Sequence, residues 1–183
     1  YAAQLVGWDL GRAAVSDADF GWGVRRNRAG AAATLPRGAG LDSDSYARAL
    51  MARFANPGIA HRTLQIAMDG TEKLPQRWFA PAAELLSTGG DARPFALANA
   101  IWLAWLCRLQ QAGTRPDDPR ADALMARMHD AGMDATRLPV AVLSLPGLAP
   151  AALVESQIFT GAVTRALTTI ANDGIRRVIT SGD

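Results

Sequence analysis

The sequence has few of the side chains that most often carry chemistry. Its 183 residues include one cysteine, Cys107, and two histidines, His61 and His129. A single cysteine excludes an internal disulfide and suits a reducing cytoplasm. Because Cys107 lies in an apolar run, we expect a small buried hydrophobe there, not a nucleophile. The histidines are far apart and lie in no HExxH, HxxxH or CxxC pattern, so the sequence predicts no metal site.

Nucleotide-binding loops are also missing. The only GxG pairs, at 21–23 and 38–40, have no third glycine at the required spacing, and no strand-like segment precedes them. A dinucleotide site needs that strand–turn–helix context, because it brings backbone N–H groups to the pyrophosphate. No Walker loop and no GxSxG nucleophile motif is present. The chain is therefore not expected to bind NAD by itself.

Neither charge nor hydrophobicity is concentrated in one stretch. With 19 basic and 17 acidic residues, the net charge of +2 gives no electrostatic footprint for general nucleic-acid binding. The most apolar run, residues 95–109, is shorter than the roughly 20 residues that span a bilayer, and it contains Asn99. We expect a central core helix there and no membrane segment.

Alternating strand patterns are almost absent, whereas helix signals recur. Residues 42–45 offer several N-caps, and Asp118-Pro119 is predicted to cap the helix that follows it. An apolar stripe from Phe159 to Ile170 ends at Asn172-Asp173-Gly174. Only residues 140–143 (VAVL) have strand composition, and prolines bracket them closely. The fold is predicted to be all-α.

The start of the chain suggests that it is part of a longer polypeptide. It begins at Tyr1 without an initiator methionine, in a stretch that resembles a helix already in progress. We expect an N-terminal helical arm over residues 1–36 and a main bundle over residues 41–183. Residues 34–40 (TLPRGAG) are the best internal linker between them.

A cluster of cationic side chains lies between residues 46 and 77. Arg53, His61, Arg62, Lys73 and Arg77 each stand beside a turn or a short helix. Such a cluster can present positive donors to an anionic ligand. A solvated basic face has the same appearance, because charged side chains are mostly exposed. Composition alone leaves both interpretations open.

The motifs in this cluster resemble a known family. The stretch RFANPGIAHRTLQIAMDGTEKLPQRW is similar to the start of the C-terminal domain in the mannitol dehydrogenase family, the long-chain polyol dehydrogenases. The matching elements are Arg53-Phe54, Asn56-Pro57, Asp69-Gly70-Thr71, Lys73, Pro75 and Arg77. Residues 61–68 look most like the D-mannonate oxidoreductase (fructuronate reductase) branch. The resemblance is strong over about 35 residues and weaker towards both ends.

This resemblance implies an all-α, multi-helix bundle like the C-terminal substrate domain of these enzymes, which is 6-phosphogluconate dehydrogenase C-terminal-like. Such enzymes bind NAD in an N-terminal Rossmann domain and close the helical domain over the sugar. A hydride then moves between the nicotinamide and a keto-sugar carbon. The family's KxxxxNxxH motif, with its catalytic lysine, is not in this chain. We therefore expect the chain alone to be inactive, with its own Rossmann domain as its partner.

The resemblance also supplies candidate site residues. Lys73 matches a substrate-contacting lysine of the family, and Gln65 matches a position that is arginine in the mannitol branch. His61, Arg62 and Arg77 are further candidates for substrate contact. D-fructuronate and D-mannonate are the expected substrate pair, with tagaturonate or mannitol as alternatives. A free-standing, non-catalytic helical interaction module remains a separate interpretation.

Overall fold

The computed structural model describes residues 1–18, 42–56 and 62–181. These residues are helical with short connections, and the described part contains no β-strand, only one isolated bridge between Leu10 and Arg62. The all-α prediction is confirmed. The helices are α1 (Ala2–Val6), α2 (Gly11–Ser16), α4 (Ser43–Ala55), α5 (Thr63–Ala67), α6 (Gly70–Leu74), the π-helical turn η1 (Pro75–Phe79), α7 (Ala80–Ser87), α8 (Arg93–Gln111), α9 (Ala121–Asp130), α10 (Leu138–Leu143), α11 (Ala151–Glu155), α12 (Gln157–Asp173) and α13 (Ile175–Ser181).

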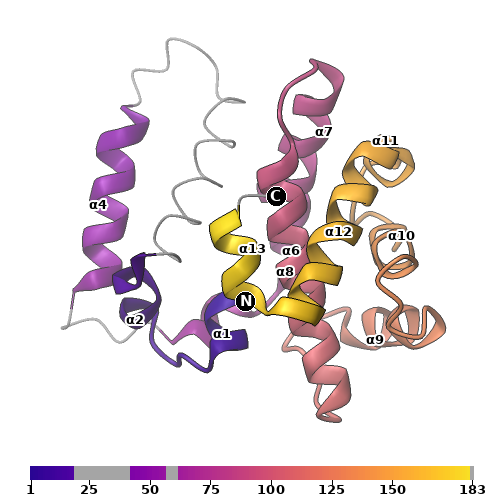
Figure 1. Ribbon diagram of the computed structural model, residues 1–183, viewed down its shortest axis with the longest axis horizontal. Coiled ribbons are helices and arrows are strands. Elements are labelled where there is room, and N and C mark those ends of the chain that lie inside the picture. Colours follow the sequence, from indigo (N-terminus) through magenta and orange to yellow (C-terminus); the bar gives the residue numbers. More distant parts are fainter. Residues whose placement is uncertain (19–41, 57–61, 182–183) are drawn as a thin grey trace.

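Helix α8 forms the centre of the bundle. It packs most extensively against α12, and α1 also lies against it (Figure 1). Phe95, Trp102, Leu103 and Leu106 are almost completely buried, as the apolar run at 95–109 predicted. Their burial supplies much of the hydrophobic stabilisation of the domain. No helix in the described ranges is long and apolar enough to cross a membrane.

Helix ends follow the sequence signals in some places and depart from them in others. Asp42 caps α4, since its carboxylate accepts the Ser45 N–H at 3.0 Å. Gly174, at φ 85°, ends α12 as predicted. The cap predicted at Asp118-Pro119 is wrong in detail, because α9 begins at Ala121 and its N-cap is Arg120. The strand-like VAVL segment lies in helix α10.

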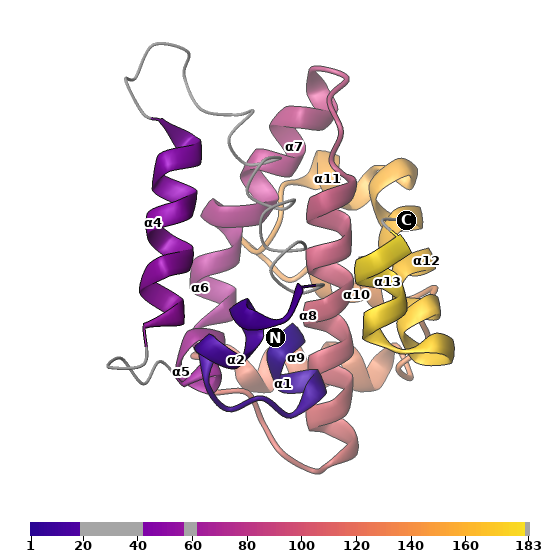
Figure 2. The same cartoon turned by 60° about the vertical axis from the view of Figure 1, so that its left-hand side comes forward.

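Helix α4 lies at one edge of the molecule in both views (Figures 1 and 2). It contacts α2, and none of the side chains described in these two helices belongs to the main core cluster. Arg53 is exposed on α4, with its guanidinium 5.8 Å from the centroid of the Phe54 ring. The site residues from residue 62 onward belong to other elements, at the base of the α6–α7 helix.

Three elements form one continuous helix from Gly70 to Ser87. Helix α6 leads directly into η1, where the Ala80 N–H bonds to the Pro75 carbonyl five residues earlier, and α7 follows. Pro75 has no N–H to donate to the preceding turn, which favours a local change in hydrogen bonding there. Pro81 occupies the first turn of α7. This continuous helix carries the central residues of the candidate site.

Candidate functional site

Lys73 is held on α6 by contacts within its own turn. Its Nζ donates to the Met68 carbonyl at 2.8 Å and lies 3.5 Å from the Asp69 carboxylate. An ammonium group carries three N–H donors, so the hydrogen bond to Met68 leaves donor capacity for a ligand. The side chain is 31% exposed and thus within reach from solvent. Lys73 is also the only lysine of the chain, whose other basic residues are all arginine.

Asp69 forms the turn that precedes this lysine. It has φ 54° and ψ 41°, the left-handed conformation, and it is the N-cap residue of α6. Aspartate adopts this conformation more readily than most residues. Its N–H donates to the Asp117 carbonyl at 2.9 Å, and its own carbonyl accepts the Lys73 N–H at 3.0 Å. The residue with positive φ in the Asp69-Gly70 pair is therefore the aspartate.

Gly70 is required because a side chain would not fit at this position, not because of its backbone conformation. A Cβ added there would lie 2.9 Å from the Tyr1 hydroxyl oxygen, 3.2 Å from Trp102 Nε1 and 3.5 Å from Asp118 Oδ2. The first distance is shorter than real Cβ contacts, so a side chain would push these groups apart. Gly70 therefore lets a phenol, an indole and a carboxylate approach the backbone at the start of α6.

Asp118 anchors the same turn from a distant part of the chain. One carboxylate oxygen accepts the Thr71 N–H at 2.8 Å, and the other accepts the Thr71 hydroxyl at 2.5 Å and the Arg120 N–H at 2.9 Å. Thr71 itself is 2% exposed. Hydrogen bonds to a carboxylate from a buried partner are stronger than neutral ones. The carboxylate predicted to cap α9 thus satisfies the first turn of α6, 47 residues earlier.

Tyr1 packs behind this turn in an aromatic cluster. Its ring centroid lies 5.0 Å from that of Trp105, 6.0 Å from Trp78 and 6.4 Å from Trp102. Burial raises the pKa of the Tyr1 hydroxyl above its ordinary value, as does the negative charge of Asp118. The phenol therefore stays protonated at neutral pH. It belongs to the wall of the site, which α8 supports through its two tryptophans.

Helix α5, which carries Gln65, is tied to the N-terminal segment. The Thr63 hydroxyl donates to the Trp8 carbonyl at 2.6 Å and accepts the Gln4 side-chain amide at 2.5 Å. The Thr63 N–H donates to the Asp9 carbonyl at 2.9 Å. Thr63 is buried, so these bonds are shielded from water. They fix the base of α5 while its other face remains exposed.

The predicted ligands on α5 and η1 present exposed side chains. Gln65, Arg62 and Arg77 are all exposed, and none has a side-chain hydrogen bond or ion pair with another described residue. Arg77 acts electrostatically on the Tyr1 hydroxyl and lowers its pKa, opposing Asp118. His61 lies outside the described residues. Thus Lys73 is held in place, whereas Gln65, Arg62 and Arg77 are surface side chains without fixed partners in the described part.

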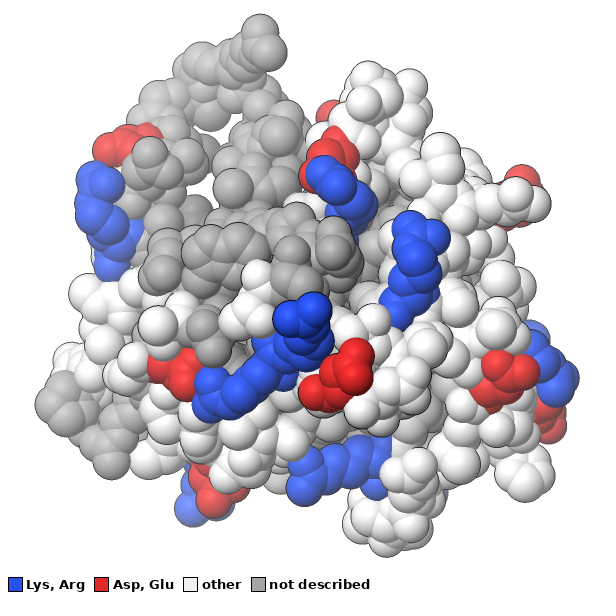
Figure 3. Space-filling view, in the orientation of Figure 1, with Lys and Arg blue, Asp and Glu red and all other residues white. Residues whose placement is uncertain are grey.

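The described residues give little support to other kinds of site. They contain no group of three or more histidine, cysteine, aspartate or glutamate side chains that could hold a metal ion. On the face shown in Figure 3, the acidic and basic side chains of these residues are interspersed and do not form one large patch.

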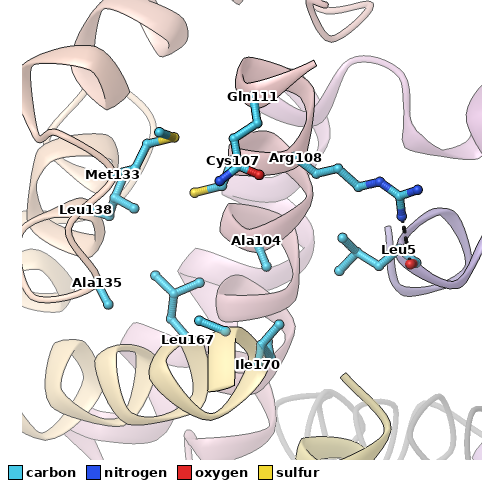
Figure 4. A pocket seen from close by; sticks show the side chains of 11 residues that line it. Leu5, Ala104, Cys107, Arg108, Gln111, Met133, Ala135, Leu138, Leu167 and Ile170 are labelled. Carbon is cyan, nitrogen blue, oxygen red and sulfur yellow. Dashed lines mark hydrogen bonds between the residues drawn. The ribbon is translucent and has the colours of Figure 1, made fainter. Parts of the chain in front are cut away.

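A separate pocket lies away from Lys73. It has a volume of about 330 Å³ and lies between α8, α12 and the corner that leads into α10 (Figure 4). Cys107 and Arg108 line it, and Arg108 donates to the Leu5 carbonyl at 2.7 Å. Burial raises the pKa of the Cys107 thiol to about 11, so the thiol is protonated and unreactive near neutral pH. None of the predicted ligands among the described residues lines this pocket.

Two residues of the site were missed by sequence reasoning. Asp118 accepts hydrogen bonds from Thr71, which lies 47 residues earlier, and no local sequence pattern indicates such a contact. Tyr1 reaches Gly70 only because α1 packs against α8. Lys73, by contrast, was proposed from the sequence, because it matches a substrate-contacting lysine of the family that the chain resembles.

Comparison with known proteins identifies the domain type. The sequence profile of the family described as "Mannitol dehydrogenase C-terminal domain" matches residues 1–171. D-mannonate oxidoreductase of Escherichia coli (strain K12) is 36% identical over 151 residues, which cover 81% of this chain and 30% of that protein. Mannitol 2-dehydrogenase of Phaeosphaeria nodorum is 31% identical over 147 residues, which cover 79% of this chain and 25% of that protein.

A solved structure has the same fold. The mannitol 2-dehydrogenase of Pseudomonas fluorescens, in a ternary complex with NAD and D-mannitol, superposes with a TM-score of 0.87 at 22% identity. The superposition covers 99% of this chain and 37% of that protein. The chain therefore spans about a third of the length of the relatives it matches.

Proposed function

The chain belongs to the mannitol dehydrogenase family, and we propose that it is the substrate-binding domain of a longer NAD-dependent oxidoreductase that interconverts D-fructuronate and D-mannonate. The observation that carries the proposal is Lys73. It is a lone lysine whose ammonium donates to the Met68 carbonyl and pairs with Asp69, on a turn fixed by Asp118. A held ammonium suits an oxygen-rich, anionic sugar better than a mobile one, because less freedom is lost on binding.

The choice of a hexuronate rests on charge and on similarity. A uronate brings one carboxylate and several hydroxyls. Lys73, Arg62 and Arg77 offer positive donors, and the amide of Gln65 can both donate to and accept from a hydroxyl. The 36% identity to a D-mannonate oxidoreductase favours the same substrate class. A mannitol-type polyol dehydrogenase is the second candidate, favoured by the 31% identity to a mannitol 2-dehydrogenase.

The nicotinamide cofactor belongs to another part of the protein in this proposal. The described residues form helices and short connections, and they offer no glycine turn between a strand and a helix that would hold a pyrophosphate. When bound there, NAD supplies the hydride acceptor or donor. The residues of this chain bind and orient the sugar, and by the family resemblance the proton-transfer lysine lies outside it. The chain alone is therefore proposed to be inactive.

The partner in this proposal is the nucleotide-binding domain of the same polypeptide. Leu64 and Ile66 flank Gln65 on α5 and are 53% and 49% exposed. Large apolar side chains in such a position are candidates for coverage by another domain. Because Gln65 is a proposed sugar ligand, the domain that covers its neighbours would also close the sugar site. In this proposal the sugar lies between the two domains.

The test is a substrate panel on the complete protein. NADH oxidation is measured with D-fructuronate, D-tagaturonate and D-fructose, and kcat/KM is compared. The proposal predicts the highest value for fructuronate. A highest value for fructose would replace it with the mannitol type. Absence of turnover with all three, in a protein that binds NADH, would favour a non-catalytic module.

A further inference from the structure

We propose that Asp118 is a positioning residue for substrate binding, which acts by fixing the ammonium group of Lys73. This inference rests on the proposed role of Lys73 in binding the sugar. Asp118 does not contact Lys73 in the structure. It contacts the turn on which Lys73 and both partners of its ammonium are built.

The geometry of the turn supports an indirect effect. Met68 and Asp69 supply the carbonyl and the carboxylate that hold the Lys73 ammonium. The Asp117 carbonyl fixes the Asp69 N–H, and the Asp118 carboxylate fixes Thr71 through both its N–H and its hydroxyl. The segment from 68 to 73 is thus held at two points by one short loop. If either point loosens, the lysine moves together with its partners.

The nature of these hydrogen bonds indicates that the Asp118 side chain contributes more to holding the turn than the Asp117 side chain does. Its contacts with Thr71 are hydrogen bonds to a charged acceptor, and Thr71 is almost fully buried. The Asp117 contact uses only a main-chain carbonyl, which any residue at 117 supplies. The Asp117 side chain is exposed. Replacing the Asp118 carboxylate should therefore affect substrate binding much more than replacing the Asp117 carboxylate, although the two side chains are chemically identical.

This difference provides a matched pair of variants. Asp118→Asn keeps the size of the side chain but replaces one charged oxygen with an NH₂ group. It can still accept one bond from Thr71 and loses the other acceptor. Asp117→Asn makes the same change of charge at the preceding residue and keeps the main-chain carbonyl that accepts the Asp69 N–H. Thr71→Val and Thr71→Ser form a second pair, since only serine retains the hydroxyl that bonds to Asp118.

The experiment measures KM and kcat of the complete protein for the uronate, together with KM for NADH. For Asp118→Asn we expect KM for the sugar to rise roughly three- to tenfold, less than the roughly 10- to 150-fold for direct loss of a charge-assisted hydrogen bond, because Asp118 acts only through Lys73. KM for NADH should not change. Thr71→Val should show the same pattern more weakly, and Thr71→Ser and Asp117→Asn should resemble the parent. A purely structural defect would lower kcat through loss of folded enzyme and leave KM unchanged.

A double-mutant cycle then separates this inference from the proposed function. If Asp118 acts through Lys73, Asp118→Asn should have little further effect on kcat/KM in a Lys73→Ala background. An equal effect in both backgrounds would overturn the inference and leave the role of Lys73 intact. No effect of Lys73→Ala by itself would overturn the proposed site. If Asp118→Asn does not fold, the Thr71 pair gives the same readout, and equal KM values for valine and serine at that position would refute the inference.

Discussion

Gly70 gives the most specific prediction about the stability of the site. Replacement by alanine would place a Cβ 2.9 Å from the Tyr1 hydroxyl oxygen and 3.2 Å from Trp102 Nε1. Both groups belong to rigid rings packed in the aromatic cluster, so neither moves away easily. Overpacking of this kind costs about 1–3 kcal/mol. Alanine recovers at most about 1 kcal/mol of helix propensity, so we expect a net loss of about 1–2 kcal/mol.

The assay is thermal unfolding with a matched control. For a domain of this size, about 1–2 kcal/mol corresponds to a fall in Tm of about 2–8 °C. Gly161 is the control, because it lies inside α12 and a Cβ there would meet only the Arg165 guanidinium, at 3.5 Å. Gly161→Ala should raise Tm through helix propensity. If Gly70→Ala is as stable as Gly161→Ala, the close packing at the start of α6 is wrong.

Two further predictions concern the bundle and its cysteine. Trp102 is 1% exposed, so Trp102→Ala should reduce the free energy of unfolding by about 3–5 kcal/mol in denaturant titration, and a loss below about 1 kcal/mol would contradict its core position. Burial raises the pKa of Cys107 to about 11, so the native thiol should react with iodoacetamide slowly at pH 8 and faster as the pH approaches 11. If the native protein reacts at pH 8 as fast as the unfolded chain, the raised pKa is refuted. Because the folded chain favours the neutral thiol, this group should lower stability as the pH rises above the ordinary thiol value.

The sequence predicted those elements whose cause is local. The core helix at 95–109 appears as α8 because its apolar residues alone require burial on several sides. The stop at Gly174 follows from a backbone conformation with positive φ, 85°, which glycine accepts more readily than other residues. The position of Lys73 beside a turn was likewise visible in the sequence. The contacts of the Lys73 ammonium with Met68 and Asp69 involve only residues close in the sequence.

Features that depend on residues far apart in the sequence could not be predicted from local patterns. Asp118 has the sequence appearance of a local cap, yet its carboxylate serves α6 because tertiary packing brings the two segments together. The VAVL segment has strand composition but forms helix α10, where Val142 and Leu143 are buried in the core. The π-helical turn at 75–79 was not predicted, since only Pro75 hints at it. For Asp118 and the VAVL segment, a contact made elsewhere in the fold outweighed the local preference.

The effect of Lys73→Ala on the complete protein tests the central claim most directly. Loss of one charge-assisted hydrogen bond to the sugar should lower kcat/KM for fructuronate by roughly 10- to 150-fold. Gln65→Ala should cost less, because it removes a neutral partner, and KM for NADH should not change for either variant. Arg115→Ala is the control, since it removes one exposed cation whose described partner is Asp122. If Lys73→Ala stays within about twofold of the parent, as Arg115→Ala should, then Lys73 is only a surface charge and the site is placed wrongly.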